Sequence, residues 1–217
     1  EGAQAICHLG NFPGFRGSGD TDGFANNVNA TYNVFHAAQK HGIRQVVYAS
    51  SIQAYGAFGT PRSRPVYLPM DEQHPHLPRH AYALSKSVGE QIADSFVRLD
   101  PELTVFSMRY TAIHLPRHSY PPKHQNHKSS AGGSLFTWVR VEDAAVATCL
   151  ATEKRRPGHT PLNIIAPAPA RPWTPDEIVE AYEGMPEMRN GLSGTDSPIT
   201  WTQARDILGF VATLPRE

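Results

Sequence analysis

The chain contains 217 residues, and its 20 lysine and arginine residues balance 20 aspartate and glutamate residues, so that the formal net charge at neutral pH is zero. This balance argues against a protein that binds nucleic acid or a membrane surface, because both need a basic face to meet phosphate groups. No stretch approaches the roughly 18 consecutive apolar residues of a membrane span, and the two cysteines lie far apart and form no disulfide framework. We therefore expect a soluble cytoplasmic protein without a signal peptide.

The first half of the chain alternates short apolar runs with amphipathic segments. Residues 3–9 form an apolar run that predicts a buried strand, and residues 22–41 carry apolar side chains at spacings of three and four, which predicts a helix. A β-branched run at 43–50, a second helical stripe at 80–99 and an apolar run at 103–110 continue the alternation. This order is typical of a doubly wound α/β fold with a parallel sheet.

The second half is less regular. An alanine-rich segment at 141–153 predicts a helix, residues 161–166 predict a strand, and Thr174-Pro175-Asp176-Glu177 carries the cap and acidic first turn of another helix. A short last element is expected near 202–208. Because the alternation loosens after about residue 115, we expect a smaller region appended to the sheet.

Three residues of the first half are suited to hydride transfer at a carbinol or carbonyl carbon. Ser51 lies just past a predicted strand, at the carboxyl edge where open α/β sheets bind ligands. Tyr82 and Lys86 are four residues apart on a predicted helix, so their side chains project from the same face. A lysine ammonium favours a nearby phenolate, so we expect Lys86 to lower the pKa of Tyr82, which can then act as a general acid or base. Taken alone, a Tyr-x-x-x-Lys pair is more typical of a helix with a solvated lysine, because such pairs are common.

A series of short motifs runs almost from end to end of the chain. They are Ala5 to Gly10, Asn27-Val28-Asn29-Ala30-Thr31, Val46 to Gly56, Tyr82-x-x-x-Lys86 with Glu90, Ser107-Met108-Arg109-Tyr110, Phe136 to Ala145, and Ala204 to Phe210. In this collinear order they resemble the extended short-chain dehydrogenases/reductases, the NAD-dependent epimerase/dehydratase family. The resemblance implies an NAD(P)-dependent oxidoreductase or epimerase acting on a hydroxyl of a sugar or sugar acid, similar to a uronate dehydrogenase or to a nucleotide-sugar epimerase or dehydratase.

The same resemblance implies roles for individual residues. Tyr82 would be the catalytic acid or base, Lys86 would bind the nicotinamide ribose, and Ser51 would orient the substrate oxygen, with Ser50 as the neighbouring alternative. Asn27 matches a helix asparagine that supports the lysine through water. The residues expected to bind the cofactor, NAD with NADP not excluded, are His8, Leu9, Gly10, Tyr82, Lys86 and Tyr110.

The expected partners are a small sugar-type substrate and a second copy of the chain. The resemblance implies a homodimer formed through the helices at 22–41 and 80–99. No metal site is expected, because the spacings of the clustered histidines match no common zinc pattern; these are His114, His118, His124 and His127.

The glycine-rich turn that meets the pyrophosphate in this family does not occur in the sequence. Family members begin with a strand running into Gly-x-x-Gly-x-x-Gly, whereas this chain begins at what resembles their fourth strand. The segment Gly14 to Gly19 is favoured as a surface loop over a phosphate loop. We therefore expect residues 1–115 to be the C-terminal part of a dinucleotide-binding Rossmann domain with the catalytic residues, and 116–217 a small substrate-binding region interleaved with the sheet. The alternative is a catalytically silent truncated fragment or pseudoenzyme that serves as an interaction module.

Overall fold

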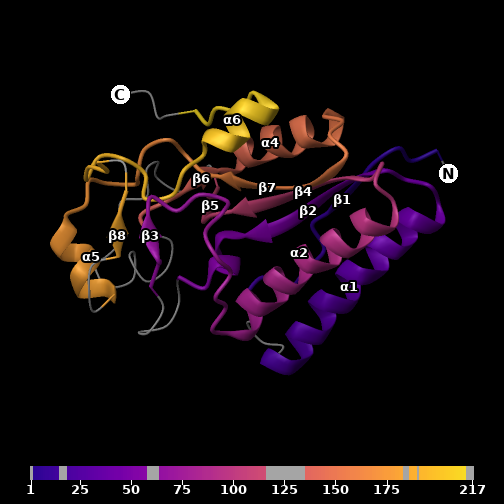
Figure 1. Cartoon of the computed structure of the whole chain (residues 1–217), viewed down its shortest axis with the longest axis horizontal. Coiled ribbons are helices and arrows are strands. Elements are labelled where there is room, and N and C mark those ends of the chain that lie inside the picture. Colours follow the sequence, from indigo (N-terminus) through magenta and orange to yellow (C-terminus); the bar gives the residue numbers. More distant parts are fainter. Residues whose placement is uncertain are drawn as a thin grey trace.

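The centre of the structure, a computed structural model, is a parallel four-stranded sheet in the order β1-β2-β4-β7 (Figure 1). Its strands are β1 (Ile6–His8), β2 (Gln45–Ser51), β4 (Thr104–Tyr110) and β7 (Gly158–Ile164). The structure describes residues 2–14, 19–57, 64–115, 135–182, 186–189 and 191–213. The parallel sheet with interspersed helices confirms the predicted α/β fold class.

Helices cover both faces of this sheet. The long helices α1 (Asp20–Lys40) and α2 (Ala81–Leu99) lie together on one face, and α4 (Val141–Glu153) and α6 (Thr202–Leu208) lie on the other (Figure 1). Because successive strand residues point to opposite faces, Val46 packs among side chains of α1 and α2, whereas Val47 packs among side chains of α4 and α6. This two-sided burial explains why the strands read as unbroken apolar runs. None of the helices in the described ranges is long and apolar enough to cross a membrane.

A smaller layer of short elements lies at the carboxyl end of the sheet (Figure 1). It contains the 3₁₀ turn η1 (Ile52–Tyr55), the pair β3 (Tyr67–Leu68) and β8 (Glu187–Met188), the pair β5 (Ile113–His114) and β6 (Val139–Arg140), and α5 (Pro175–Tyr182). A separate apolar core fills it, with Leu68, Met70, Trp173 and Ile178 among its buried members. In the second half of the chain, β7 is a strand of the main sheet, and α4 and α6 pack on that sheet. The division into two domains stays a prediction.

The predicted elements differ from the observed ones mainly at their ends. The helix at 141–153 has the predicted bounds, while β7 begins at Gly158 rather than at Pro161. Pro161 pairs with Ser107 inside β7, where a residue without an amide hydrogen is tolerated because β7 is the last strand of the sheet.

The contact between α2 and β2 depends on Gly89. A Cβ added at Gly89 would overlap the hydroxyl and ring of Tyr48, a side chain with no exposed surface. We expect Gly89→Ala to lower the free energy of unfolding by about 1–3 kcal/mol, because the helix must move away from the sheet. Urea unfolding would measure this, with Gly10→Ala as the control, since a Cβ there meets its nearest atom at 4.0 Å. Equal unfolding midpoints for the two variants would contradict the prediction.

Candidate active site

Ser51, Tyr82 and Lys86 meet at the carboxyl end of the sheet. Ser51 is the last residue of β2, and its Oγ accepts a hydrogen bond from the Gln53 amide at 3.2 Å, which caps η1. The same hydroxyl lies 3.5 Å from the backbone oxygen of Tyr110 on the neighbouring strand. Tyr82 lies in the first turn of α2 and hydrogen-bonds the Ser51 hydroxyl. The structure thus joins two residues that the sequence separates by a long loop.

Lys86 lies one turn further along α2, and its ammonium group lies over the rings of Tyr82 and Tyr48. Its Nζ donates a 2.7 Å hydrogen bond to the Ala49 carbonyl and lies 5.5 Å from the centroid of the Tyr82 ring and 5.3 Å from that of Tyr48. The residue is only 3% exposed. Burial lowers the pKa of the Lys86 ammonium to about 8, although the nearby Glu90 carboxylate raises it. The solvated lysine considered from the sequence is therefore not what the structure shows.

The expectation that the pKa of Tyr82 lies below its ordinary value is wrong for this arrangement. Burial raises the pKa of the Tyr82 phenol above its ordinary value, and the hydrogen bond with Ser51 offsets this only in part. The physical reason is that both groups are withdrawn from water, and desolvation disfavours their charged forms. Tyr82 is consequently a protonated phenol at neutral pH.

Asn27 forms hydrogen bonds with the backbone of the segment that follows β1. This fully buried side chain of α1 accepts a hydrogen bond from the Phe12 amide at 2.8 Å and donates one to the Phe12 carbonyl at 3.1 Å. Its Nδ2 also lies 3.4 Å from the hydroxyl of Ser85, the residue before Lys86. Asn27 thereby links three elements beside the site, while its water-mediated support of Lys86 stays a prediction.

The residues predicted to contact a cofactor at the end of β1 have different environments. His8 is buried, with Nε2 3.1 Å from the Thr31 hydroxyl, and burial together with the charge of Lys86 lowers its pKa to about 4. Leu9 is 59% exposed, and Gly10 is also exposed. The His8 ring is therefore buried and uncharged at neutral pH, whereas Leu9 and Gly10 are exposed.

Tyr110 and Ser50 direct their side chains away from Tyr82. The Tyr110 hydroxyl lies 2.5 Å from the Thr148 hydroxyl on α4, and burial raises its pKa to about 12. The hydrogen bond from Ser51 is to the backbone oxygen of Tyr110. The Ser50 hydroxyl donates a 2.6 Å hydrogen bond to Glu90. Ser51, not Ser50, is thus the serine that the structure brings to Tyr82.

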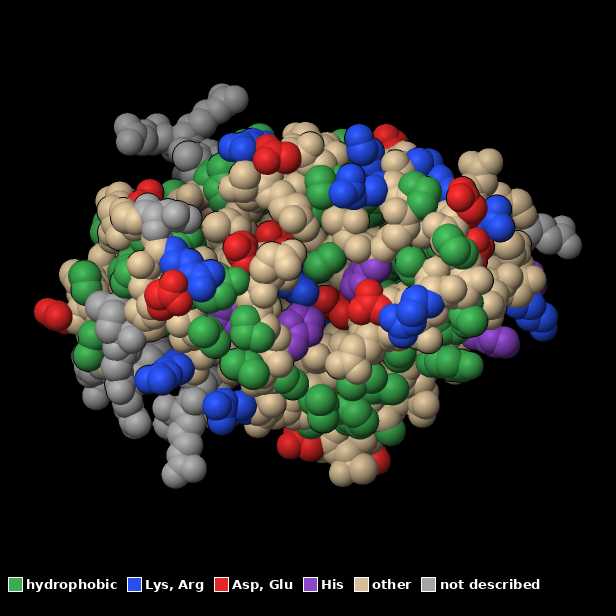
Figure 2. Space-filling view, in the orientation of Figure 1, with side chains coloured by type: hydrophobic (Ala, Val, Ile, Leu, Met, Phe, Trp, Pro, Cys, Tyr) green, Lys and Arg blue, Asp and Glu red, His purple; other side chains and the backbone are tan. Residues whose placement is uncertain are grey.

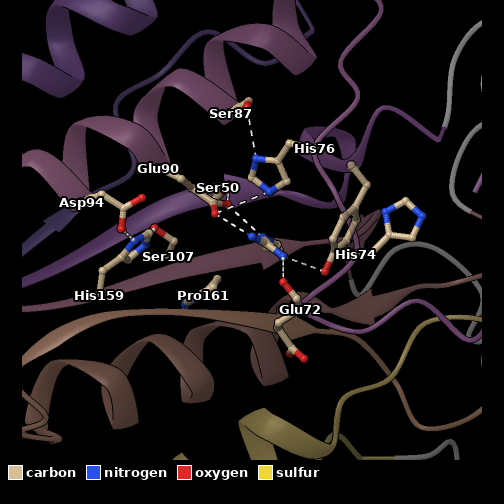
Figure 3. Close-up of polar contacts among 12 residues, drawn as sticks. Ser50, Glu72, His74, His76, Ser87, Glu90, Asp94, Ser107, His159 and Pro161 are labelled. Carbon is tan, nitrogen blue, oxygen red and sulfur yellow. Dashed lines mark hydrogen bonds and ion pairs between the residues drawn. The ribbon is translucent and has the colours of Figure 1, made fainter. Parts of the chain in front are cut away.

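A buried ionic network lies beneath the site and is not predicted by the sequence, although Glu90 and Arg109 belong to the family-like motifs. Glu90, labelled in Figure 3, accepts two hydrogen bonds from the guanidinium of Arg109. Their lengths are 2.9 Å from Nε and 2.7 Å from Nη2. Nη1 of Arg109 reaches the Tyr55 hydroxyl at 2.9 Å and the Glu72 carbonyl at 3.1 Å. Arg109 holds the pKa of Glu90 below its ordinary value despite burial. A charged residue inside an apolar strand is the signal that could have indicated this network.

A serine, a histidine and an aspartate also form a hydrogen-bonded row at the edge of the sheet (Figure 3). The Ser107 hydroxyl lies 2.7 Å from His159 Nε2, and His159 Nδ1 lies 2.7 Å from the Asp94 carboxylate. The order matches that of a serine-nucleophile triad, but Ser107 has no exposed surface and pairs with strands on both sides. A substrate carbonyl cannot reach Ser107, so these hydrogen bonds are structural and connect α2, β4 and β7.

Two segments considered from the sequence lie outside the described residues. They are residues 15–18 of the glycine-rich segment and residues 116–134, which include His118, His124 and His127. Within the described ranges no group of three or more histidine, cysteine, aspartate and glutamate side chains could hold a metal ion.

Comparison with known proteins assigns a family to this arrangement. The model of the NAD dependent epimerase/dehydratase family matches residues 1–164. UDP-glucose 4-epimerase 2 of Oryza sativa subsp. japonica is 33% identical over 87 residues, which are 40% of this chain and 20% of the rice protein. A uronate dehydrogenase of Pseudomonas syringae pv. tomato is 30% identical over 96 residues, 44% of this chain and 32% of that protein.

Solved structures agree at the level of the fold. The UDP-glucose 4-epimerase from Bifidobacterium longum, solved in complex with NAD⁺ and UDP, superposes on 99% of this chain and 73% of its own, with a TM-score of 0.69 and 18% sequence identity. The matches to the rice and Pseudomonas proteins span only 20% and 32% of the length of those relatives.

Proposed function

Because the chain belongs to the NAD dependent epimerase/dehydratase family, we propose that the protein is an NAD(P)-dependent oxidoreductase or epimerase acting on a hydroxyl of a sugar or sugar acid. The observation that carries this proposal is the meeting of Ser51, Tyr82 and Lys86 at one edge of the sheet. A phenol hydrogen-bonded to a serine hydroxyl, above a buried ammonium, is suited to moving one proton to or from a substrate oxygen.

The described residues fit the nicotinamide end of such a cofactor. Among the described contacts, Lys86 Nζ uses one of its three N–H donors, toward Ala49, so two remain for the hydroxyl groups of a ribose. Gly10, two residues past the end of β1, has no side chain, so a ligand can approach its backbone. Residues for the pyrophosphate are not among those described. We infer contacts to the cofactor from His8, Leu9, Gly10, Tyr82 and Lys86, and from Tyr110 through its backbone.

The chain's own residues then have separable roles. When bound, the nicotinamide ring supplies the acceptor or donor of hydride. Ser51 Oγ holds the substrate oxygen, and Tyr82 exchanges the proton of that oxygen. Because the pKa of Tyr82 is raised, the phenol is ready to donate a proton at neutral pH. As a base it must first lose that proton, and the nearby charge of Lys86 then stabilises the phenolate.

The relatives support a sugar-type substrate. Uronate dehydrogenases and UDP-glucose 4-epimerases are both among the similar proteins, so a free sugar acid and a nucleotide sugar are the two substrates to compare. We infer that the substrate region lies within residues 116–217. A cytoplasmic location belongs to the same proposal, since Cys7 and Cys149 are both free thiols.

Cofactor titration tests the proposal directly. We expect calorimetry of the protein with NAD and with NADP to detect binding to one of them, and Lys86→Met to weaken it at least tenfold. Affinity should fall as the pH rises through about 8, because the Lys86 ammonium loses its proton there. Turnover of a uronate or a UDP-hexose would then be followed by the absorbance of reduced nicotinamide. Binding of neither cofactor would contradict the proposal.

A homodimer through α1 and α2 is part of the proposal. Figure 2 shows hydrophobic side chains gathered along the lower edge of the drawn face, where these two helices lie. Tyr32 on α1 is 51% exposed and Leu84 on α2 is 42% exposed. Covering such side chains favours association. Sedimentation equilibrium of the protein and of a Tyr32→Glu, Leu84→Glu double variant should give a dimer and a monomer respectively; a monomeric wild type would contradict this.

A further inference from the structure

A histidine occupies the N-cap of the helix that carries Tyr82 and Lys86. His80 has an extended backbone, and its Nδ1 accepts a 3.2 Å hydrogen bond from the Ala83 amide. Caps are ordinarily serine, threonine, aspartate or asparagine, whose side-chain oxygen accepts at every moderate pH. An imidazole nitrogen accepts only while it is unprotonated. The first turn of α2 is thus held by a bond that a proton can break.

The opposite nitrogen of the same ring connects the cap to Ser51. His80 Nε2 lies 3.2 Å from Gln53 Oε1, and the Gln53 amide donates to Ser51 Oγ. The His80 ring also stacks in parallel on the Tyr82 ring, with centroids 6.4 Å apart and planes at 5°. Since Tyr82 hydrogen-bonds Ser51, these four residues form a closed set of contacts around the candidate active site.

Both bonds of His80 require one protonation state. A carbonyl oxygen of Gln53 needs a hydrogen on Nε2, and the Ala83 amide needs a lone pair on Nδ1, so the ring is the neutral Nε2–H tautomer. A second proton would go on Nδ1, replace the acceptor by a donor, and put a positive charge against the helix N-terminus. Protonation of His80 therefore removes the cap.

The charges around His80 are few. Asp20, at the start of α1, raises the His80 pKa, and burial lowers it by more, so that the pKa lies below its ordinary value. Gln53 of η1 is uncharged and Tyr82 of α2 is a neutral phenol, while Arg79 precedes His80 in the chain. The neutral tautomer consequently prevails at neutral pH, and the cap is lost only when the pH falls below the ordinary histidine range.

We propose that His80 is a positioning residue whose neutral ring holds the first turn of α2, and with it Tyr82, against Ser51, and whose protonation releases this turn. The structural part of the proposal needs neither cofactor nor turnover; its consequence for catalysis rests on the proposed function. Protonation of His80 would thus change the position of Tyr82 relative to Ser51.

Two substitutions separate the cap from its titration. His80→Asn keeps a side-chain oxygen that can accept from Ala83 but does not titrate, whereas His80→Ala removes the acceptor. Both variants change a half-buried loop residue rather than the core. Circular dichroism at neutral pH would establish that each variant is folded before the comparison.

NMR of the cofactor-free protein provides the readout. In the wild type, ¹⁵N shifts of His80 should show the Nε2–H tautomer at neutral pH, and the ring signals of Tyr82 should shift in acid with the same midpoint as His80. With His80→Asn the Tyr82 signals should no longer shift between neutral pH and acid. With His80→Ala they should not shift either, and the Ala83 amide, which has lost its acceptor, should exchange faster with solvent at neutral pH. An Nδ1–H tautomer, or an unchanged acid shift in His80→Asn, would overturn the proposal.

Steady-state kinetics provide a second test of the role of His80. If the protein turns over a sugar substrate, kcat of the wild type should fall in acid with the His80 midpoint, and His80→Asn should remove that fall. If it turns over none, the proposed function fails, and the NMR comparison still decides the role of His80. An acid fall of kcat that is identical in the wild type and in His80→Asn would overturn the catalytic consequence.

Discussion

Arg109→Leu is expected to lower the free energy of unfolding by about 3–5 kcal/mol, because it leaves the Glu90 carboxylate buried without its partner. Arg109 is 3% exposed and donates two hydrogen bonds to Glu90. With Arg109 gone, burial would dominate and raise the pKa of Glu90 above its ordinary value, so the carboxyl would bind a proton more readily. Urea unfolding at several pH values would show this loss increasing as the pH rises, since the native state then has to give up the extra proton.

Two comparisons isolate the charge effect in that experiment. An Arg109→Leu, Glu90→Leu double variant should recover part of the loss, because no unpaired charge stays in the core. Arg44→Ala breaks an exposed pair with Asp100 and should change the unfolding midpoint much less, since water solvates both groups. An Arg109→Leu protein as stable as the wild type would contradict the assignment of Glu90 as an ionised, buried partner.

Tyr82→Phe is expected to lower kcat for hydride transfer by about 10²–10⁴-fold, the usual contribution of a general acid or base. The ring and its stacking on His80 would be retained, so cofactor affinity should change little, and the loss should be in kcat. Steady-state kinetics together with calorimetry of the same variant measure the two effects separately. Full activity in Tyr82→Phe would exclude the assigned role.

A matched control for this substitution removes another phenol. The Tyr67 hydroxyl donates to Asp71 at 2.6 Å in the layer of short elements, away from Ser51. Tyr67→Phe should therefore keep kcat near that of the wild type. An equal loss in both variants would indicate a general effect on folding rather than proton transfer by Tyr82.

Local regularities of the sequence account for the elements and their order. Apolar runs and three-four spacings depend only on neighbouring residues, so they predict the helices α2 and α4 and the strands β2 and β4 to within two residues. The spacing of Tyr82 and Lys86 places both on one face of any helix. Two strand starts were less predictable: β1 begins only at Ile6, and β7 begins at Gly158, three residues before the predicted start at Pro161.

The candidate site could be predicted only as a set of residue types. The order of the motifs indicates Ser51, Tyr82 and Lys86. It does not show that Ser51 pairs with Tyr110 or contacts Tyr82, because both contacts join segments far apart in the chain. The side chain of Tyr110 faces α4, and no local pattern shows on which side of a fully buried strand a residue points.

The sequence alone thus determines which residues are candidates for the site, the order of the elements, and the helical spacing of Tyr82 and Lys86. Each of these depends on interactions within a few residues. The protonation states do not. Withdrawal from water raises the pKa of Tyr82 and lowers those of Lys86 and His80, and a carboxylate and a guanidinium become one buried pair. Desolvation and pairing depend on what the whole fold packs around a group, so tertiary structure determines them.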